Sequence, residues 1–122
     1  MTTELRRHIM FVDDDEFIGE LMEEFLTDSG HVVSRYSDPA AAFADFVDDC
    51  KRFDVLITDE SMPGMGGSEL AAKIREIRPD LPIVLCTGTA LSVEPKNQGA
   101  VSVILQKPVG LQSLLETIER LQ

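Results

Sequence analysis

Hydrophobic residues alternate between two patterns along this chain. Five short runs rich in apolar or β-branched residues, each bounded by acidic or turn-forming residues, are typical of the strands of a parallel sheet. Between these runs, apolar residues recur every three or four positions, which predicts amphipathic helices. We expect the strands at 8–12, 32–36, 54–58, 83–87 and 101–105. The repeated strand–helix order predicts an α/β fold, in which one doubly wound domain spans residues 1–122 and carries helices on both faces of its sheet.

The predicted helices differ in how clearly their ends are marked. The first, over 16–26, is followed by Ser29-Gly30, and the second begins where Ser37 or Asp38 precedes Pro39. The weakest prediction is a helix over 90–98, because that segment contains Pro95 and lacks a regular apolar face. We expect the following side chains to face inward: Phe17, Ile18, Leu21, Met22, Phe25 and Leu26; Ala42, Phe43, Phe46 and Val47; Leu70, Ala71, Ile74 and Ile77; Leu111, Leu114, Leu115, Ile118 and Leu121.

Four of the five predicted strands end at a residue that can take part in chemistry. Asp13 and Asp14 follow the first strand, Asp59 the third, Thr87 ends the fourth, and Lys107 follows the fifth. Parallel strands bring their carboxyl ends to one edge of the sheet, where α/β proteins bind ligands. Taken singly, Asp59 could merely begin a turn, Thr87 could belong to one, and Lys107 could be an ordinary surface lysine. Their joint placement predicts a functional site.

The predicted group of side chains favours phosphoryl transfer with a metal ion. Three crowded carboxylates require a cation, and a small set of hard oxygen ligands suits Mg²⁺. A lysine ammonium and a threonine hydroxyl are suitable partners for a phosphoryl group. Asp59 would then be the nucleophile that becomes an aspartyl phosphate. The metal and Lys107 would neutralise charge on the transferred oxygens.

Charge and cysteine content exclude several classes of function. A net charge of −11 argues against free-standing nucleic-acid binding. Thirteen of the 22 acids lie in the first 49 residues, including the run 13–16, which would also suit a helix N-terminus. Cys50 and Cys86 show no zinc-ligand spacing with each other, His8 or His31, which predicts reduced structural thiols and a cytoplasmic location. Neither a signal peptide nor a membrane-spanning run is evident.

Taken together, the motifs of this chain resemble those of response-regulator receiver domains in bacterial two-component signalling. The resemblance covers 8–122 and implies a flavodoxin-like (βα)5 fold with the strand order 2-1-3-4-5. The segments at 59–67 and 85–88 are most similar to receivers of hybrid sensor histidine kinases, so the chain is expected to be a stand-alone receiver or part of a larger protein. The matching segments are Phe-Val-Asp-Asp-Asp at 11–15, Asp59 with Met62-Pro63 and Gly66-Gly67, Thr87-Gly88, Gly99-Ala100 and Lys107-Pro108.

The resemblance also implies a role for each site residue. Asp59 would be the phosphoacceptor, Asp14 would bind Mg²⁺ directly, and Asp13 would bind it chiefly through water. The backbone carbonyl of Ser61 would complete the metal site. The remaining implied features are contacts of Thr87 and Lys107 with the phosphoryl group, tuning of its lifetime by Ser61 and Thr89, and a cis Lys107–Pro108 bond.

A receiver would be a signalling module rather than an enzyme, although it catalyses its own phosphorylation and its hydrolysis. The donor would be a phosphohistidine on a sensor kinase or phosphotransfer protein. The output would be a shift of the face formed by the fourth helix, fifth strand and fifth helix, with a downstream protein or a second copy as candidate partner. Ile104 stands where an aromatic residue is usual, and the segment between Thr87 and Gly99 is short, so the usual output mechanism is expected to be altered.

Two alternatives remain open from the sequence. One is a pseudo-receiver that binds partners without being phosphorylated, which the complete set of site residues disfavours. The other is a phosphatase of the haloacid dehalogenase type. Residues 13–17 match the two acids of the Asp-x-Asp-x-Thr/Val motif of these enzymes but not its fifth position. The chain also has no room for a cap domain. Neither a GxxxxGK phosphate loop nor a Gly-x-Ser-x-Gly elbow is present.

Overall fold

A single five-stranded parallel sheet forms the centre of the molecule. The structure, a computed structural model, describes residues 6–89, 93 and 95–121. The strands lie in the order β2-β1-β3-β4-β5, so the predicted doubly wound fold and its strand order are confirmed. They are β1 (His8–Val12), β2 (Val32–Tyr36), β3 (Val55–Asp59), β4 (Ile83–Thr87) and β5 (Val103–Gln106).

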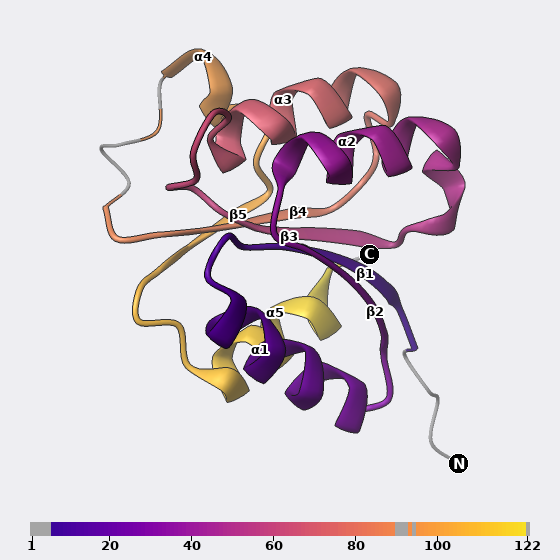
Figure 1. Ribbon diagram of the computed structural model, residues 1–122, viewed down its shortest axis with the longest axis vertical. Helices are drawn as coiled ribbons and strands as arrows, with labels where there is room; N and C mark the ends of the chain where they lie inside the picture. Colours follow the sequence, from indigo (N-terminus) through magenta and orange to yellow (C-terminus); the bar gives the residue numbers. More distant parts are fainter. Residues whose placement is uncertain (1–5, 90–92, 94, 122) are drawn as a thin grey trace.

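Helices cover both faces of this sheet. Helices α2, α3 and α4 lie on one face, and α1 and α5 lie on the other (Figure 1). A single turn of 3-10 helix, η1 (Cys50–Arg52), follows α2. Among the described residues, no helix combines the length and hydrophobicity needed to cross a bilayer. The helices are α1 (Glu16–Asp28), α2 (Pro39–Asp48), α3 (Gly67–Ile77), α4 (Pro95–Gln98) and α5 (Leu111–Arg120).

The sheet separates two apolar clusters. Successive side chains of a strand point to opposite faces. Met10 of β1 therefore packs in the cluster beneath α2 and α3, with Phe46 and Ile74. Ile9, on the other face, packs with Ile118 of α5. Because β1, β3 and β4 are buried on both faces, the ends of these strands are held rigidly, and this fixes the positions of the residues that follow them.

The predicted helix starts agree with the observed caps. Asp15 caps α1 by accepting a hydrogen bond from the N–H of Ile18 at 3.1 Å. Asp38 caps α2 in the same way through the N–H of Ala40 at 3.0 Å, with Pro39 as the first helical residue. The run of acids after β1 thus contributes both to the sheet edge and to the start of a helix.

Some predicted inward faces were too wide. Phe17 and Val47 are 72% and 55% exposed, and Leu21 and Ile77 are also exposed. The helical period was correct, but a helix on a sheet buries only the centre of its apolar stripe. In α1, for example, Leu26 is completely buried while Phe17, in the first turn, is not.

The fifth strand and the helix before it also differ from the prediction. The N–H of Val101 donates to the carbonyl of Gln98, so residue 101 still belongs to the turn after α4 and the strand begins at Val103. In the described part of the chain, α4 is one turn long and begins at Pro95, where the missing N–H is harmless. The rest of the predicted helix, at 90–92 and 94, lies outside the described residues.

Candidate functional site

Three carboxylates meet at the edge of the sheet where the strands end. Asp13 and Asp14 follow β1 and Asp59 ends β3; each offers an oxygen, and these oxygens all lie within 4.8 Å of one another. The register pairs Val12 with Thr58, so the two strand ends are level. Asp13 and Asp59 are only 6% and 5% exposed, whereas Asp14 is exposed. The predicted convergence of the three acids is therefore present.

Backbone groups fix the orientation of Asp13. Its Oδ1 accepts a hydrogen bond from the N–H of Asp15 at 2.9 Å, and its own N–H donates to the Tyr36 carbonyl at 3.0 Å. Burial raises the pKa of Asp13, and the charges of Asp59 and Asp14 add to that effect, while the Asp15 N–H and Lys107 oppose it. The ionised form of Asp13 is therefore unfavourable in this site, and a bound cation would stabilise it.

Lys107 provides a positive charge at this edge. Its Nζ forms an ion pair with Asp59 Oδ1, and among the described residues no other group donates to that buried oxygen. Burial lowers the pKa of Lys107, but its hydrogen bond to Asp59 and the charges of Asp59 and Asp13 outweigh burial, so the pKa is raised. Its N–H donates to the Thr87 carbonyl at 2.8 Å, and the Lys107–Pro108 bond is cis, as the resemblance implied.

Thr87 and Ser61 lie at the same edge of the sheet as the acids, but Thr87 is buried and Ser61 is exposed to solvent. Thr87 ends β4 and is buried; its hydroxyl donates to the Thr89 carbonyl at 3.0 Å and accepts from the Thr89 N–H at 3.3 Å. The neighbouring Cys86 is the register partner of Asp59, so Thr87 lies one residue beyond the acid. Ser61 is exposed in the loop after β3.

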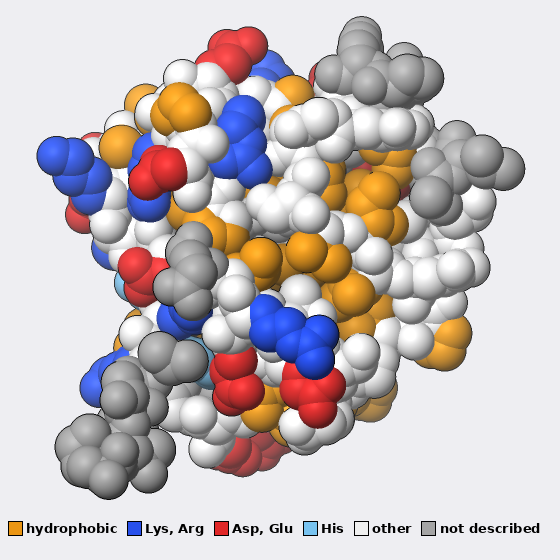
Figure 2. Space-filling model, turned by 180° about the vertical axis from the view of Figure 1, so that it is seen from behind, with side chains coloured by type: hydrophobic (Ala, Val, Ile, Leu, Met, Phe, Trp, Pro, Cys, Tyr) orange, Lys and Arg blue, Asp and Glu red, His pale blue; other side chains and the backbone are white. Residues whose placement is uncertain are grey.

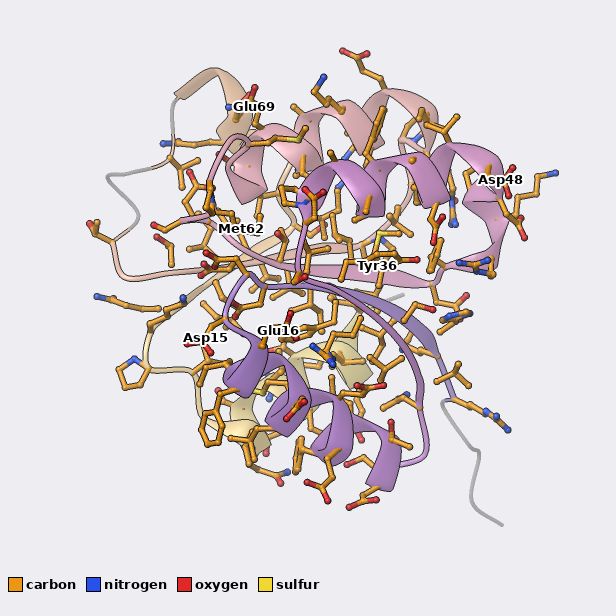
Figure 3. All side chains as sticks on the ribbon, viewed as in Figure 1. Asp15, Glu16, Tyr36, Asp48, Met62 and Glu69 are labelled. Atoms are coloured by element: carbon orange, nitrogen blue, oxygen red, sulfur yellow. The ribbon has the colours of Figure 1, made fainter. Side chains whose placement is uncertain are left out.

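The acids form the polar end of a cavity of about 920 Å³. Asp15 and Glu16, at the start of α1, and Met62, in the loop after β3, lie at this end of the sheet (Figure 3). Burial raises the pKa of the Cys86 thiol to about 12, so this cavity residue stays protonated. Beyond the acids, Ser61 and Lys107, the cavity is lined by apolar residues of α1, of the segment leading into α5 and of the start of α5, including Ile18, Leu21, Met22, Val109 and Leu111.

The donor set is able to hold a metal ion. It consists of hard carboxylate oxygens, and one of them, Asp59 Oδ1, is buried with a single cationic partner. Such oxygens favour hard divalent cations over soft ones. The exposed Asp14 leaves one side of the group open to solvent, where a cation could keep some of its water ligands.

Sequence patterns did not reveal two residues that shape this site. The carboxylate of Glu60 accepts hydrogen bonds from the N–H and the hydroxyl of Ser68, at 2.7 and 3.0 Å. Gly67 lies so close to β3 that a Cβ there would be 2.0 Å from the Asp59 carbonyl oxygen. The Gly66-Gly67 pair was noted as part of a motif, but nothing in the sequence shows that one of these glycines contacts Asp59.

Comparison with protein families gives one match over most of the chain. The model of the response regulator receiver domain matches residues 9–119. Among curated proteins, the response regulator receiver protein CpdR of Brucella abortus is 31% identical over 117 residues, which cover 94% of this chain and 96% of CpdR. The transcriptional regulatory protein FixJ of Rhizobium meliloti is 34% identical, and the aligned part is 92% of this chain but 55% of FixJ.

Solved structures show the same similarity in three dimensions. A response regulator receiver domain protein from Clostridium thermocellum has a TM-score of 0.86 at 26% identity, covering 93% of this chain and 91% of that one. The response regulator TrrA of Thermotoga maritima, solved in complex with Mg²⁺-BeF, has a TM-score of 0.85 at 28% identity, covering 95% and 99%. The chain therefore belongs to the response regulator receiver domain family.

Proposed function

We propose that Asp59 is the phosphoacceptor of this receiver domain and that Lys107, Thr87 and a metal ion assist its phosphorylation. The observation that carries the proposal is the buried Asp59 carboxylate, which is paired with Lys107 and lies beside Asp13 and Asp14. A carboxylate held at a strand end, with its charge already matched by a lysine, is suited to attack an incoming phosphorus atom.

The donor we propose is a phosphohistidine on a sensor histidine kinase or phosphotransfer protein. An Asp59 oxygen attacks the phosphorus, the new P–O bond forms, and the P–N bond breaks with its electron pair left on the imidazole nitrogen. Lys107, already at Asp59, is close enough to neutralise an oxygen of the transferred group. The Thr87 hydroxyl would exchange its bond to Thr89 for one to the phosphoryl group.

We propose Mg²⁺ as the metal ion, held by Asp13, Asp14, Asp59 and the backbone carbonyl of Ser61. When bound, the ion supplies positive charge beside the transferred oxygens. The carboxylate cluster and the Mg²⁺-BeF complex of the similar protein TrrA support this assignment. The raised pKa of Asp13 also supports it, because a cation would stabilise the ionised carboxyl.

The output surface we propose is the face formed by α4, β5 and α5. Hydrophobic side chains gather across the middle of the molecule when it is viewed from behind, where β5 and α5 lie (Figure 2). Ile104, on the edge strand β5, is 39% exposed. An aliphatic residue there cannot act as the usual aromatic switch, so we expect Thr87 and the backbone after β4 to transmit phosphorylation to a downstream partner.

Family membership also excludes one of the two earlier alternatives. A receiver is a signalling module, so the phosphatase alternative is abandoned, whereas the pseudo-receiver is a possible outcome of the test below. Fusion to a hybrid kinase stays a prediction. So does a cytoplasmic location, which the two free thiols, Cys50 and Cys86, support.

The test is intact mass after incubation with acetyl phosphate and MgCl₂. We expect the wild type to gain one phosphoryl group, the Asp59→Asn variant to gain none, and the exposed-site control Asp80→Asn to behave as the wild type. Excess chelator should abolish the gain. A gain that persists in Asp59→Asn would identify another nucleophile, and no gain from either acetyl phosphate or a phosphohistidine donor would establish a pseudo-receiver.

A further inference from the structure

Glu60, the residue after the proposed phosphoacceptor Asp59, makes contacts that the family assignment does not explain. We propose that the Glu60 carboxylate is a positioning residue: by capping α3 it holds the loop 61–66 and thereby presets the Ser61 carbonyl for the metal ion. This inference rests on the proposed function, because it assigns to Glu60 the support of that same metal site.

Helix α3 has no cap of its own. Its N-cap residue is Gly66, with φ −72° and ψ 161°, and glycine has no side chain that could accept a bond from the first turn. The carboxylate of Glu60 takes this role, since Oε1 accepts from the Ser68 N–H at 2.7 Å and Oε2 from the Ser68 hydroxyl at 3.0 Å. Ser68 is buried, so its donors would otherwise be left unsatisfied.

These bonds close the loop that carries Ser61. The Glu60 carbonyl also accepts from the Gly67 N–H at 3.1 Å, so residue 60 is tied to the start of α3 by three hydrogen bonds. The Glu60 N–H donates to the Cys86 carbonyl at 3.0 Å, which anchors residue 60 to β4. Glu60 therefore connects a fixed strand end with a fixed helix start.

The loop itself has few other restraints. Ser61, Pro63 and Gly64 are exposed, and Met62 and Met65 are only partly buried against the core. A segment with so few buried contacts takes its conformation from the bonds at its ends. Loss of the Glu60 carboxylate would leave the strand and helix in place but allow the Ser61 carbonyl to move away from the acids.

The test compares Mg²⁺ binding by four unphosphorylated proteins: the wild type, Glu60→Ala, Glu60→Gln and Glu69→Ala. Glu69 is the matched control, because it is an exposed acid in the first turn of α3, next to Ser68 (Figure 3). It makes no hydrogen bond among the described residues. Affinity is measured from amide chemical shifts in ¹⁵N-labelled protein during MgCl₂ titration. All proteins are compared below their unfolding temperatures.

We expect Glu60→Ala to raise the dissociation constant for Mg²⁺ on the order of tenfold, as is typical when a group supporting a metal site is lost. Glu60→Gln retains an acceptor for the Ser68 N–H and should stay within about threefold of the wild type. Glu69→Ala should bind as the wild type does. Equal affinity of Glu60→Ala and the wild type would overturn the proposal for Glu60 alone, whereas no Mg²⁺ binding by the wild type would overturn the proposed metal site as well.

A second variant separates positioning of the loop from stability of the helix. In the Glu60→Ala background, Gly66→Ser places a capping side chain at the N-cap with Glu69 three residues later, which is the arrangement of a capping box. We expect the unfolding temperature to recover while Mg²⁺ affinity stays low, because the link from residue 60 to residue 68 is still missing. Recovery of both would show that Glu60 merely stabilises α3 and would overturn the proposal.

Discussion

His31 is a buried histidine whose ring already has a structural role. Its Nδ1 accepts a hydrogen bond from the Arg7 N–H at 3.1 Å, where the chain enters β1. Burial lowers the pKa of His31 from its ordinary value of 6.5, the charge of Arg7 lowers it further, and Glu119 of α5 opposes them. The folded state therefore favours the neutral ring, with Nδ1 free of a proton.

This shift predicts a dependence of stability on pH. Because the folded pKa lies below the unfolded one, the contribution of His31 is present above pH 6.5 and is lost as the pH falls toward the folded pKa. We expect His31→Asn, which keeps an acceptor for the Arg7 N–H but does not titrate, to show a smaller loss of stability between pH 7.5 and about pH 5. Urea unfolding of both proteins across this range measures the difference. Parallel pH profiles would contradict the assignment.

At the scale of residues, the sequence predicts the side chains that strand ends bring together, but it does not predict contacts made by long side chains. Asp13, Asp59 and Lys107 were predictable because each follows an apolar run and parallel strands share an edge. Arg75 was not: its guanidinium donates to the carbonyls of Ala100, at 2.8 Å, and Leu81, at 2.6 Å. The contacts of Arg75 with these carbonyls, and of Glu60 with Ser68, produce no periodic pattern in the sequence.

Among the elements, β3 and α3 approach each other closely beside the site. Gly67 is the first residue of α3, and a Cβ there would be 2.0 Å from the carbonyl oxygen and 2.9 Å from the carbonyl carbon of Asp59. Both are backbone atoms of a buried strand, so they cannot rotate away as a side chain could. The absence of a side chain is what lets α3 begin directly against the end of β3.

Gly67→Ala is accordingly expected to destabilise the fold by about 1–3 kcal/mol, as overpacking against backbone generally does. Gly99→Ala is the matched control, since a Cβ there meets nothing within 4 Å, and its effect should be within about 0.5 kcal/mol. Urea unfolding measures both free energies. If Gly67→Ala were as stable as the control, α3 would be able to move off β3 freely, contrary to the geometry.

Element boundaries show where hydrophobic periodicity is informative and where it is not. Strands β1, β2 and β4 have the predicted bounds, because an acidic or turn-forming residue directly follows each of them. The outer apolar residues of helices, such as Phe17 and Val47, were predicted to be buried although the sheet does not reach them. The period of the apolar residues identifies which side of a helix faces the core. It does not give the width of the buried face, which depends on the neighbouring elements.

For the whole molecule, the excess of acids acts at two levels. The 22 acidic and 11 basic side chains give a net charge of −11, which opposes compaction through general repulsion. At the sheet edge, Asp13, Asp14 and Asp59 add a local repulsion that Lys107 only partly offsets. Monovalent salt screens the general repulsion, whereas a divalent ion held by the three acids relieves the local one.

The two effects should separate in thermal unfolding experiments with the wild type and Asp13→Asn, which retains an acceptor for the Asp15 N–H. We expect NaCl, raised to about 0.5 M, to raise the unfolding temperature of both proteins similarly, because the screened charges are spread over the surface. MgCl₂ at far lower concentration should stabilise the wild type alone, by about 2.7 kcal/mol at one hundred times its dissociation constant. Without Mg²⁺, Asp13→Asn should be the more stable protein, because it lacks one of the crowded charges. Equal stabilisation of both proteins by MgCl₂ would mean that the ion acts on the general charge and that the three acids do not form its site.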